Sequence, residues 1–137
     1  MKILSLTFLF LIFSMQMART DSAAEDAALK ASTAWLDLID SGKYDASWEE
    51  AAMYFKNSVK KEEWTPTIKA VRDPFGKLLE RKLKSKQSVQ SMPGAPDGDY
   101  LIIQYDSSFE NKKSAVETVV PMMDKDGKWR ISGYFIR

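Results

Sequence analysis

The sequence has 137 residues, enough for one domain, and its 45% hydrophobic and 28% charged residues are typical of a globular protein. It contains no cysteine and no histidine, which excludes disulfides, thiol nucleophiles, Ser-His-Asp triads and imidazole-bound metals. The formal net charge of +1 offers no broadly basic surface for nucleic acid or anionic membranes.

Residues 1–23 are typical of a secretory signal peptide. A lysine at the second position precedes Ile3–Met17, which is apolar apart from small hydroxyl residues and a glutamine. This run is shorter than the ~20 residues of a membrane-spanning helix. Cleavage could follow Ala18, but the Ser22-Ala23-Ala24 cluster is preferred, and an uncleaved anchor is the alternative. We therefore expect an exported protein, periplasmic or secreted, with residues 24–137 as its single mature domain.

The first helix is expected at Ala24–Ser41. Its apolar residues recur near the 3.6-residue period of a helix. Gly42 is placed to end the helix. The residues of this predicted apolar stripe are Ala27, Ala31, Ala34, Trp35, Leu38 and Ile39.

Two further helices are expected before residue 73. Ser47-Trp48-Glu49-Glu50 fits the S-x-x-E capping box and predicts a helix from Ser47 to about Val59. The third helix is expected to begin at Lys60 or Glu62 and to end at Arg72. Pro66 would then have to lie in its first turn, where a missing N–H is tolerated.

The second half of the chain reads as strands. Asp73-Pro74-Phe75-Gly76 should stop the third helix, and the period then changes towards two. Four strands are predicted: Leu79 to about Met92, Tyr100–Phe109, Ser114–Met123 and Lys128–Arg137. The loop Pro93–Gly98 and the hairpin turn Asp124–Gly127 separate them.

The last predicted strand should place Trp129, Ile131 and Phe135 on one face, and Tyr134 with Ile136 on the other. Gly133 is expected to mark a bend or bulge.

Helices followed by a strand meander predict an α+β fold. We expect three N-terminal helices packed on a curved four-stranded antiparallel sheet. The long first helix favours a cone of the cystatin or nuclear-transport-factor-2-like type.

Several segments resemble the bacterial exported family called domain of unknown function 4019. They are Trp35-Leu36-Asp37, Asp40–Tyr44, Ser47-Trp48, Glu63-Trp64, Arg72–Gly76, Arg81, Met92–Tyr100, Gln104-Tyr105, Ser108-Phe109, Glu117-Thr118, Asp126–Arg130 and Gly133–Arg137. The resemblance runs from about Ala28 to Arg137. It implies a small exported domain with no activity to carry over. The superfamily it suggests, nuclear-transport-factor-2-like, contains both enzymes and non-catalytic binding modules, so the fold alone does not choose a function.

Polar residues on otherwise apolar strand faces are the candidate site: Glu117, Arg81 and Tyr105, joined by Arg72 and Tyr134. One interpretation is a buried ion pair of Glu117 with Arg81 or Arg72 that holds the sheet against the third helix. A second is a small polar ligand bound inside the cone. A third is catalysis, with Glu117 as general base and Tyr105 or Tyr134 as hydrogen-bond donor.

Other features have weaker functional interpretations. The loop Pro93–Tyr100 could be a recognition edge or a rigid wide turn. Asp97 and Asp99 lack the other ligands of a calcium loop. The lysines of Lys77–Lys86 could dock an acidic partner or blunt a sheet edge.

Two function hypotheses follow. The first is a non-catalytic exported module that binds a protein partner or small ligand, with a homodimer through the outer sheet face as one possibility. The alternative is a cone-fold isomerase or hydrolase using Glu117. We expect no cofactor, no metal and no nucleic-acid partner.

Overall fold

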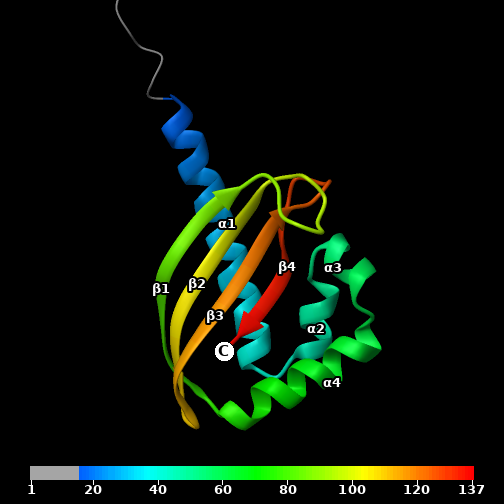
Figure 1. The fold of residues 1–137 in the computed structure, drawn as a ribbon, viewed down its shortest axis with the longest axis vertical. Helices are drawn as coiled ribbons and strands as arrows, with labels where there is room; N and C mark the ends of the chain where they lie inside the picture. The colour runs from blue at the N-terminus through cyan, green and yellow to red at the C-terminus, as the bar shows by residue number, and fades with distance from the viewer. Residues whose placement is uncertain (1–15) are drawn as a thin grey trace, which may run out of the picture.

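Four antiparallel strands in the order β1-β2-β3-β4 follow a series of helices (Figure 1). The computed structural model describes residues 16–137, with side chains from Ser22 onward, so most of the predicted signal peptide lies outside the described residues. The elements are α1 (Gln16–Asp40), α2 (Tyr44–Glu49), α3 (Met53–Ser58), α4 (Lys61–Arg72), a 3₁₀ turn η1 (Asp73–Phe75), β1 (Leu78–Val89), β2 (Tyr100–Phe109), β3 (Lys112–Met123) and β4 (Trp129–Ile136). The predicted α+β class and the helices-then-strands order are confirmed.

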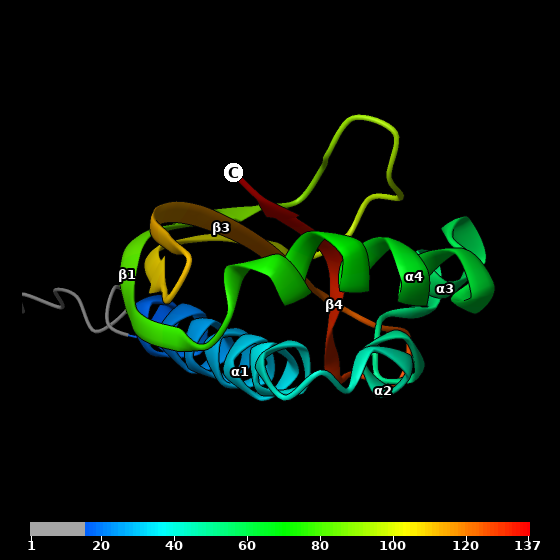
Figure 2. The ribbon, with the colours of Figure 1, turned by 90° about the horizontal axis from the view of Figure 1, so that it is seen from below.

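The helix α1 covers one face of the sheet, which we call the inner face, and contacts β2, β3 and β4 (Figures 1 and 2). The shorter helices lie beyond the β4 edge. The main core fills the space between α1, these helices and the inner face. Its largest members are Trp35, Leu36, Ile39, Tyr44, Phe55, Trp64, Ile68, Leu101, Ile103, Tyr105, Ile131 and Tyr134. Among residues 16–137, no helix has the length and apolar character needed to cross a membrane.

The buried stripe of α1 differs from the predicted one. Its buried residues are Ala28, Ser32, Trp35, Leu36 and Ile39, whereas Ala27 and Ala34 are exposed. The prediction counted every alanine as apolar, but alanine is equally suited to an exposed helix face. The described helix also begins at Gln16, before the predicted start at Ala24. Its end is as predicted: Gly42 has φ of 71° and Lys43 N–H donates to Leu38 C=O at 2.8 Å.

The predicted second helix is wrong, because the segment forms two short helices. Ser47 lies inside α2 rather than at an N-cap. Its hydroxyl donates to the Tyr44 carbonyl at 2.6 Å and accepts from Trp64 Nε1 at 2.9 Å. The break occurs where Ala52 N–H donates to the Ile131 carbonyl of β4 at 2.8 Å. A tertiary hydrogen bond to the sheet edge therefore replaces a helical one.

The helix α4 is confirmed, but Pro66 lies in its second turn rather than its first. Proline has no N–H to donate to the carbonyl of Glu62 four residues earlier. Because Pro66 is exposed, that carbonyl can bond to water instead, which makes the position tolerable.

Four irregularities in strand pairing change which residues face inward. The register shifts between Leu78 and Glu80 and between Leu83 and Ser85 in β1, between Ser107 and Phe109 in β2, and opposite Pro121 in β3. Pro121 has no N–H to donate to the strand ladder. Val120 of β3 pairs with Gly133 of β4, but the next residue, Pro121, pairs with Ile131, so Ser132 is the extra residue of the predicted bulge.

Because of this bulge, the predicted faces of the last strand are wrong. Ile131 and Tyr134 are both buried, at 2% and 8% exposure, whereas Phe135 is 67% exposed. An extra residue in β4 reverses the alternation, so Tyr134 points to the core and Phe135 to the outer face. In β1, Leu79 and Leu83 are likewise exposed. The strand face on which Arg81 lies is therefore not the buried apolar face that the sequence analysis expected.

The loop after β1 folds over the outer face of the sheet, on the side opposite α1 (Figure 2). Tyr54 donates its hydroxyl proton to the Gly94 carbonyl and Tyr100 donates to the Pro96 carbonyl. Gly98 N–H donates to the Gln90 carbonyl at 3.0 Å. The loop is therefore internally braced. It covers a second apolar cluster of Ala52, Tyr100, Val120 and Met122.

Gly76 is expected to be intolerant of any side chain. Its φ of 74° and ψ of −158° lie in a region accessible essentially to glycine alone, and an added Cβ would lie 3.1 Å from both Glu110 Cβ and Asn111 Nδ2. Gly76→Ala should therefore lower the free energy of unfolding by about 3 kcal/mol or more. Gly127→Ala is the matched control: φ is also positive, but nothing lies within 4 Å, so it should cost about 1–2 kcal/mol. Equal losses in urea unfolding would contradict this explanation.

Candidate functional site

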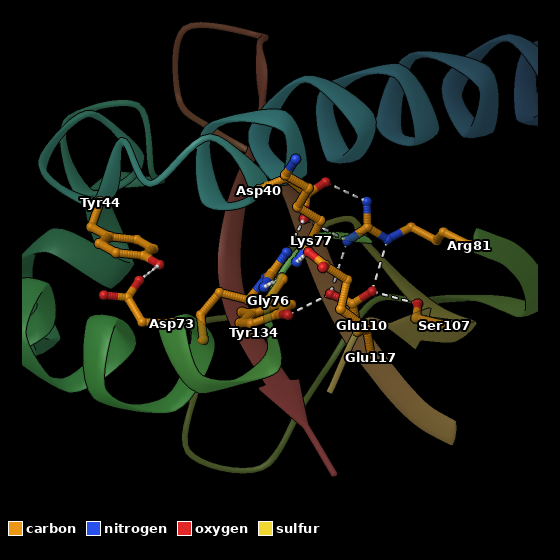
Figure 3. Close-up of polar contacts among 11 residues, drawn as sticks. Asp40, Tyr44, Asp73, Gly76, Lys77, Arg81, Ser107, Glu110, Glu117 and Tyr134 are labelled. Carbon is orange, nitrogen blue, oxygen red and sulfur yellow. Dashed lines mark hydrogen bonds and ion pairs between the residues drawn. The ribbon is translucent and has the colours of Figure 1, made fainter. Parts of the chain in front are cut away.

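A cluster of charged side chains lies on the inner face beneath the C-terminal end of α1 (Figure 3). We call it the buried charge network. Its members come from six elements, in order α1, α4, β1, β2, β3 and β4: Asp40, Arg72, Arg81, Ser107, Glu117 and Tyr134. Four of the five predicted site residues are therefore brought together.

Glu117 is the fully buried centre of the network, with 0% exposure. Its Oε1 accepts from Arg81 Nε at 2.8 Å and from the Ser107 hydroxyl at 2.5 Å. Its Oε2 accepts from Arg81 Nη2 at 3.2 Å and from the Tyr134 hydroxyl. A carboxylate has about four lone-pair positions, so Glu117 has no acceptor position left for a substrate proton.

Arg81 lies between two carboxylates. Besides the two bonds to Glu117, its Nη1 and Nη2 donate to Asp40 Oδ2 and Oδ1 at 2.8 and 3.0 Å. Burial by itself would lower the pKa of Arg81, but the hydrogen bonds that it donates to Asp40 and Glu117, together with their negative charges, raise this pKa above its ordinary value. The pair of bidentate contacts fixes the guanidinium plane.

Tyr134 closes the other side of Glu117. Burial, the negative charge of Glu117 and the hydrogen bond to it together raise the pKa of Tyr134 well above its usual range. The phenol therefore remains protonated and acts as a donor to the carboxylate.

Arg72 completes the charge balance, since two arginines face two carboxylates. It contacts Asp40 at 3.4 Å, donates to the Gly76 carbonyl at 2.5 Å, and lies 4.4 Å from the centroid of the Phe109 ring. Its buried Nε has no hydrogen-bond partner among the described residues. The aromatic face offsets part of that loss through a cation–π contact.

Tyr105 is the predicted site residue that does not join the network. It is paired with Glu117 across the β2–β3 ladder, yet its hydroxyl is directed to Ser32 of α1, at 3.4 Å. It is a core residue that contacts α1.

Sequence reasoning missed Asp40 and Ser107. Asp40 carries a usable signal, because a carboxylate in the last turn of a helix opposes the helix dipole and needs a cation nearby. Ser107 offered no comparable signal, since a serine within a strand is unremarkable.

The other charged candidates are solvated. Lys82, Lys84 and Lys86 each have an acidic partner, and Lys86 contacts Glu25 at 2.9 Å. Asp97 and Asp99 are both exposed. Within residues 16–137, no group of three or more acidic residues is arranged to hold a metal ion.

The open hollows lie away from the network. One, of about 620 Å³, lies where the N-terminal half of α1 meets the ends of the strands. A second, of about 540 Å³, borders the loop after β1. A third, of about 520 Å³, lies between α1, α2 and β4. None of these three is lined by a member of the buried charge network.

Comparison with known families places the chain. The sequence model of the family described as "Protein of unknown function (DUF4019)" matches residues 31–134. The chain belongs to this family. The resemblance to this family that the sequence analysis reported is thereby confirmed. The description of the family assigns no activity. Searches among curated proteins and among solved structures found no match.

Glu117→Gln should destabilise the fold strongly, because it leaves the buried arginines with one carboxylate fewer. Removing one partner of a buried pair costs about 3–5 kcal/mol, and urea unfolding should show a loss of that order. Glu80→Gln is the control, since the exposed Glu80–Lys82 pair at 3.3 Å should be worth less than about 1 kcal/mol. Unchanged stability in Glu117→Gln would show that the network is not structural.

The Tyr44–Asp73 hydrogen bond should weaken at high pH. Burial, followed by the hydrogen bond to Asp73 and its negative charge, raises the pKa of Tyr44 from 10.0 to about 12. The folded state thus holds this proton more tightly, so the contribution is complete below about pH 10 and is lost as pH rises through about 12. The difference in unfolding free energy between the wild type and Tyr44→Phe should shrink over that interval. A constant difference would contradict the assignment.

Proposed function

We propose that this protein is an exported, non-catalytic binding module. The observation that carries the proposal is the closure of the buried charge network. Glu117 has all four acceptor positions filled by protein donors and is fully buried. Its two arginines are likewise committed to Asp40, Glu117 and a backbone carbonyl. Such a network orients structural elements and leaves no group free for proton transfer.

The enzyme alternative is the weaker one. A general base must lie within hydrogen-bond reach of the proton that it removes. Glu117 could meet that condition only if Ser107, Arg81 or Tyr134 moved away, and each move would leave a buried charge with fewer partners. The geometry therefore favours binding over acid–base chemistry.

A finer fold assignment is part of the proposal, although the fold alone does not choose between binding and catalysis. A long helix lies across the inner face of a bulged antiparallel sheet (Figure 1), as in the nuclear-transport-factor-2-like and cystatin-like cones. This arrangement supports the proposal that the chain belongs to that superfamily.

The proposed location outside the cytoplasm rests on the sequence of residues 1–23. A basic start followed by the apolar run Ile3–Met17 is typical of a signal peptide.

The proposal predicts binding without turnover. In a thermal-shift screen of a metabolite library, a ligand at 100 times its dissociation constant adds about 2.7 kcal/mol and raises the melting temperature by several degrees. Each compound that does so should be recovered chemically unchanged after prolonged incubation, as judged by mass spectrometry. Conversion of the compound, abolished in Glu117→Gln that remains folded, would establish the enzyme instead.

A further inference from the structure

The hollow of about 620 Å³, here called the end cavity, lies far from the buried charge network. It is bounded by Glu25 near the N-terminal part of α1 and by residues at one end of β1, β2, β3 and β4. About 22 Å of helix separates Glu25 from Asp40, at 1.5 Å per residue. Its volume of about 620 Å³ lies within the range of ~300–1,000 Å³ that is common for small-molecule sites.

The charged side chains that line the end cavity are both acidic, and the α-ammonium group of Ala24 would join them after cleavage at the preferred site. Glu25 is partly neutralised by Lys86, at 2.9 Å. The Asp99 carboxylate is exposed and forms no hydrogen bond or ion pair with the described residues. Its backbone is nevertheless held, because Met123 N–H donates to the Asp99 carbonyl at 2.9 Å. The Asp99 carboxylate is therefore free to pair with a cation, and its backbone is held in place.

Trp129 gives the end cavity a second feature suited to a cation. The other three tryptophans, Trp35, Trp48 and Trp64, each donate their indole N–H to a protein oxygen at 2.7 to 2.9 Å. The indole of Trp129 is only half-buried, lines the cavity, and has no acceptor among the described residues. An indole face is the strongest of the aromatic partners for an ammonium group.

The remaining lining is apolar or neutral. Leu101 is 1% exposed and forms part of the wall, with Met123 half-buried beside the cavity. A ligand that uses this surface needs an apolar body in addition to its charge. A bare metal ion would gain nothing from such a wall and would find few carboxylates.

We propose that the end cavity binds an organic cation, an amine or quaternary ammonium compound with an apolar body. Asp99 pairs with the cationic nitrogen, Trp129 packs its ring against it, and the apolar wall receives the rest of the molecule. The inference rests on the proposed binding function and names its site and ligand class.

The test measures binding of three cations, 2-phenylethylamine, choline and spermidine, to the purified protein by calorimetry and tryptophan fluorescence. At least one should bind and change the fluorescence, and Trp129→Phe should abolish that change. If 2-phenylethylamine binds, its uncharged counterpart 2-phenylethanol should bind at least tenfold more weakly. Asp99→Asn should weaken binding of the cation about tenfold or more, since a charged hydrogen bond is lost.

Asp97→Asn is the matched control, because Asp97 is an exposed carboxylate in the same loop that does not line the end cavity. It should leave the affinity unchanged. No binding by any of the three cations, equal binding of the alcohol, or equal losses in the two variants would overturn the assignment. If the cations fail while another compound binds and is recovered unchanged, the binding function stands and this site is wrong. Turnover of a bound compound would instead refute the binding function itself.

Discussion

The burial of four charges beneath one end of α1 is the constraint on which the other contacts depend. Asp40, Arg72, Arg81 and Glu117 come from two helices and two strands, and their side chains are at most 17% exposed. Each would cost several kcal/mol if buried alone, so none can leave water until its partners arrive. The network therefore specifies how α1, α4 and the sheet meet, more than it adds net stability. Arg81 is central to this arrangement of α1, α4 and the sheet, because its planar guanidinium can donate only to partners that lie along the edges of its plane.

The same constraint explains the most distinctive segment of the sequence, Arg72–Gly76. Arg72 enters the network, and Asp73 accepts the Tyr44 hydroxyl proton. The Phe75 ring packs 5.6 Å from that of Phe109. Gly76 reverses the chain into β1 in a backbone conformation that other residues avoid. Four of the five residues of the segment thus have a structural task at the junction of helix and sheet, and none of these tasks requires a substrate.

The sequence predicted those parts of the fold that local rules determine. Tyr100–Phe109 was placed at its observed limits, and α4 was placed to within a residue or two. Where tertiary contacts override local patterns, prediction failed. The hydrogen bond from Ala52 to β4 divides the second helix, and the bulge opposite Pro121 turns Tyr134 inward and Phe135 outward. The Glu117–Arg81 pair was anticipated because two charges on apolar strand faces need each other. Asp40 was missed because a carboxylate beside the helix-ending Gly42 looks like an ordinary solvated residue, and only the helix dipole that it opposes indicates a nearby cation.

A helix that is anchored at one end can tolerate an unfilled space at the other. The C-terminal end of α1 is held by Asp40 and by the Trp35 indole bonded to the Ser47 carbonyl. Near Glu25 the contacts to the sheet are an ion pair with Lys86 and a hydrogen bond of 3.5 Å to Ser88, both at the surface, where such pairs contribute little. The end cavity is an open hollow, so the close packing required of protein interiors does not apply to it, and the opposite end of α1 determines where the helix lies. The buried charges and the open cavity are thus related. The contacts of Asp40 fix the position of α1, so the space beside Glu25 can stay open without the helix losing its place on the sheet.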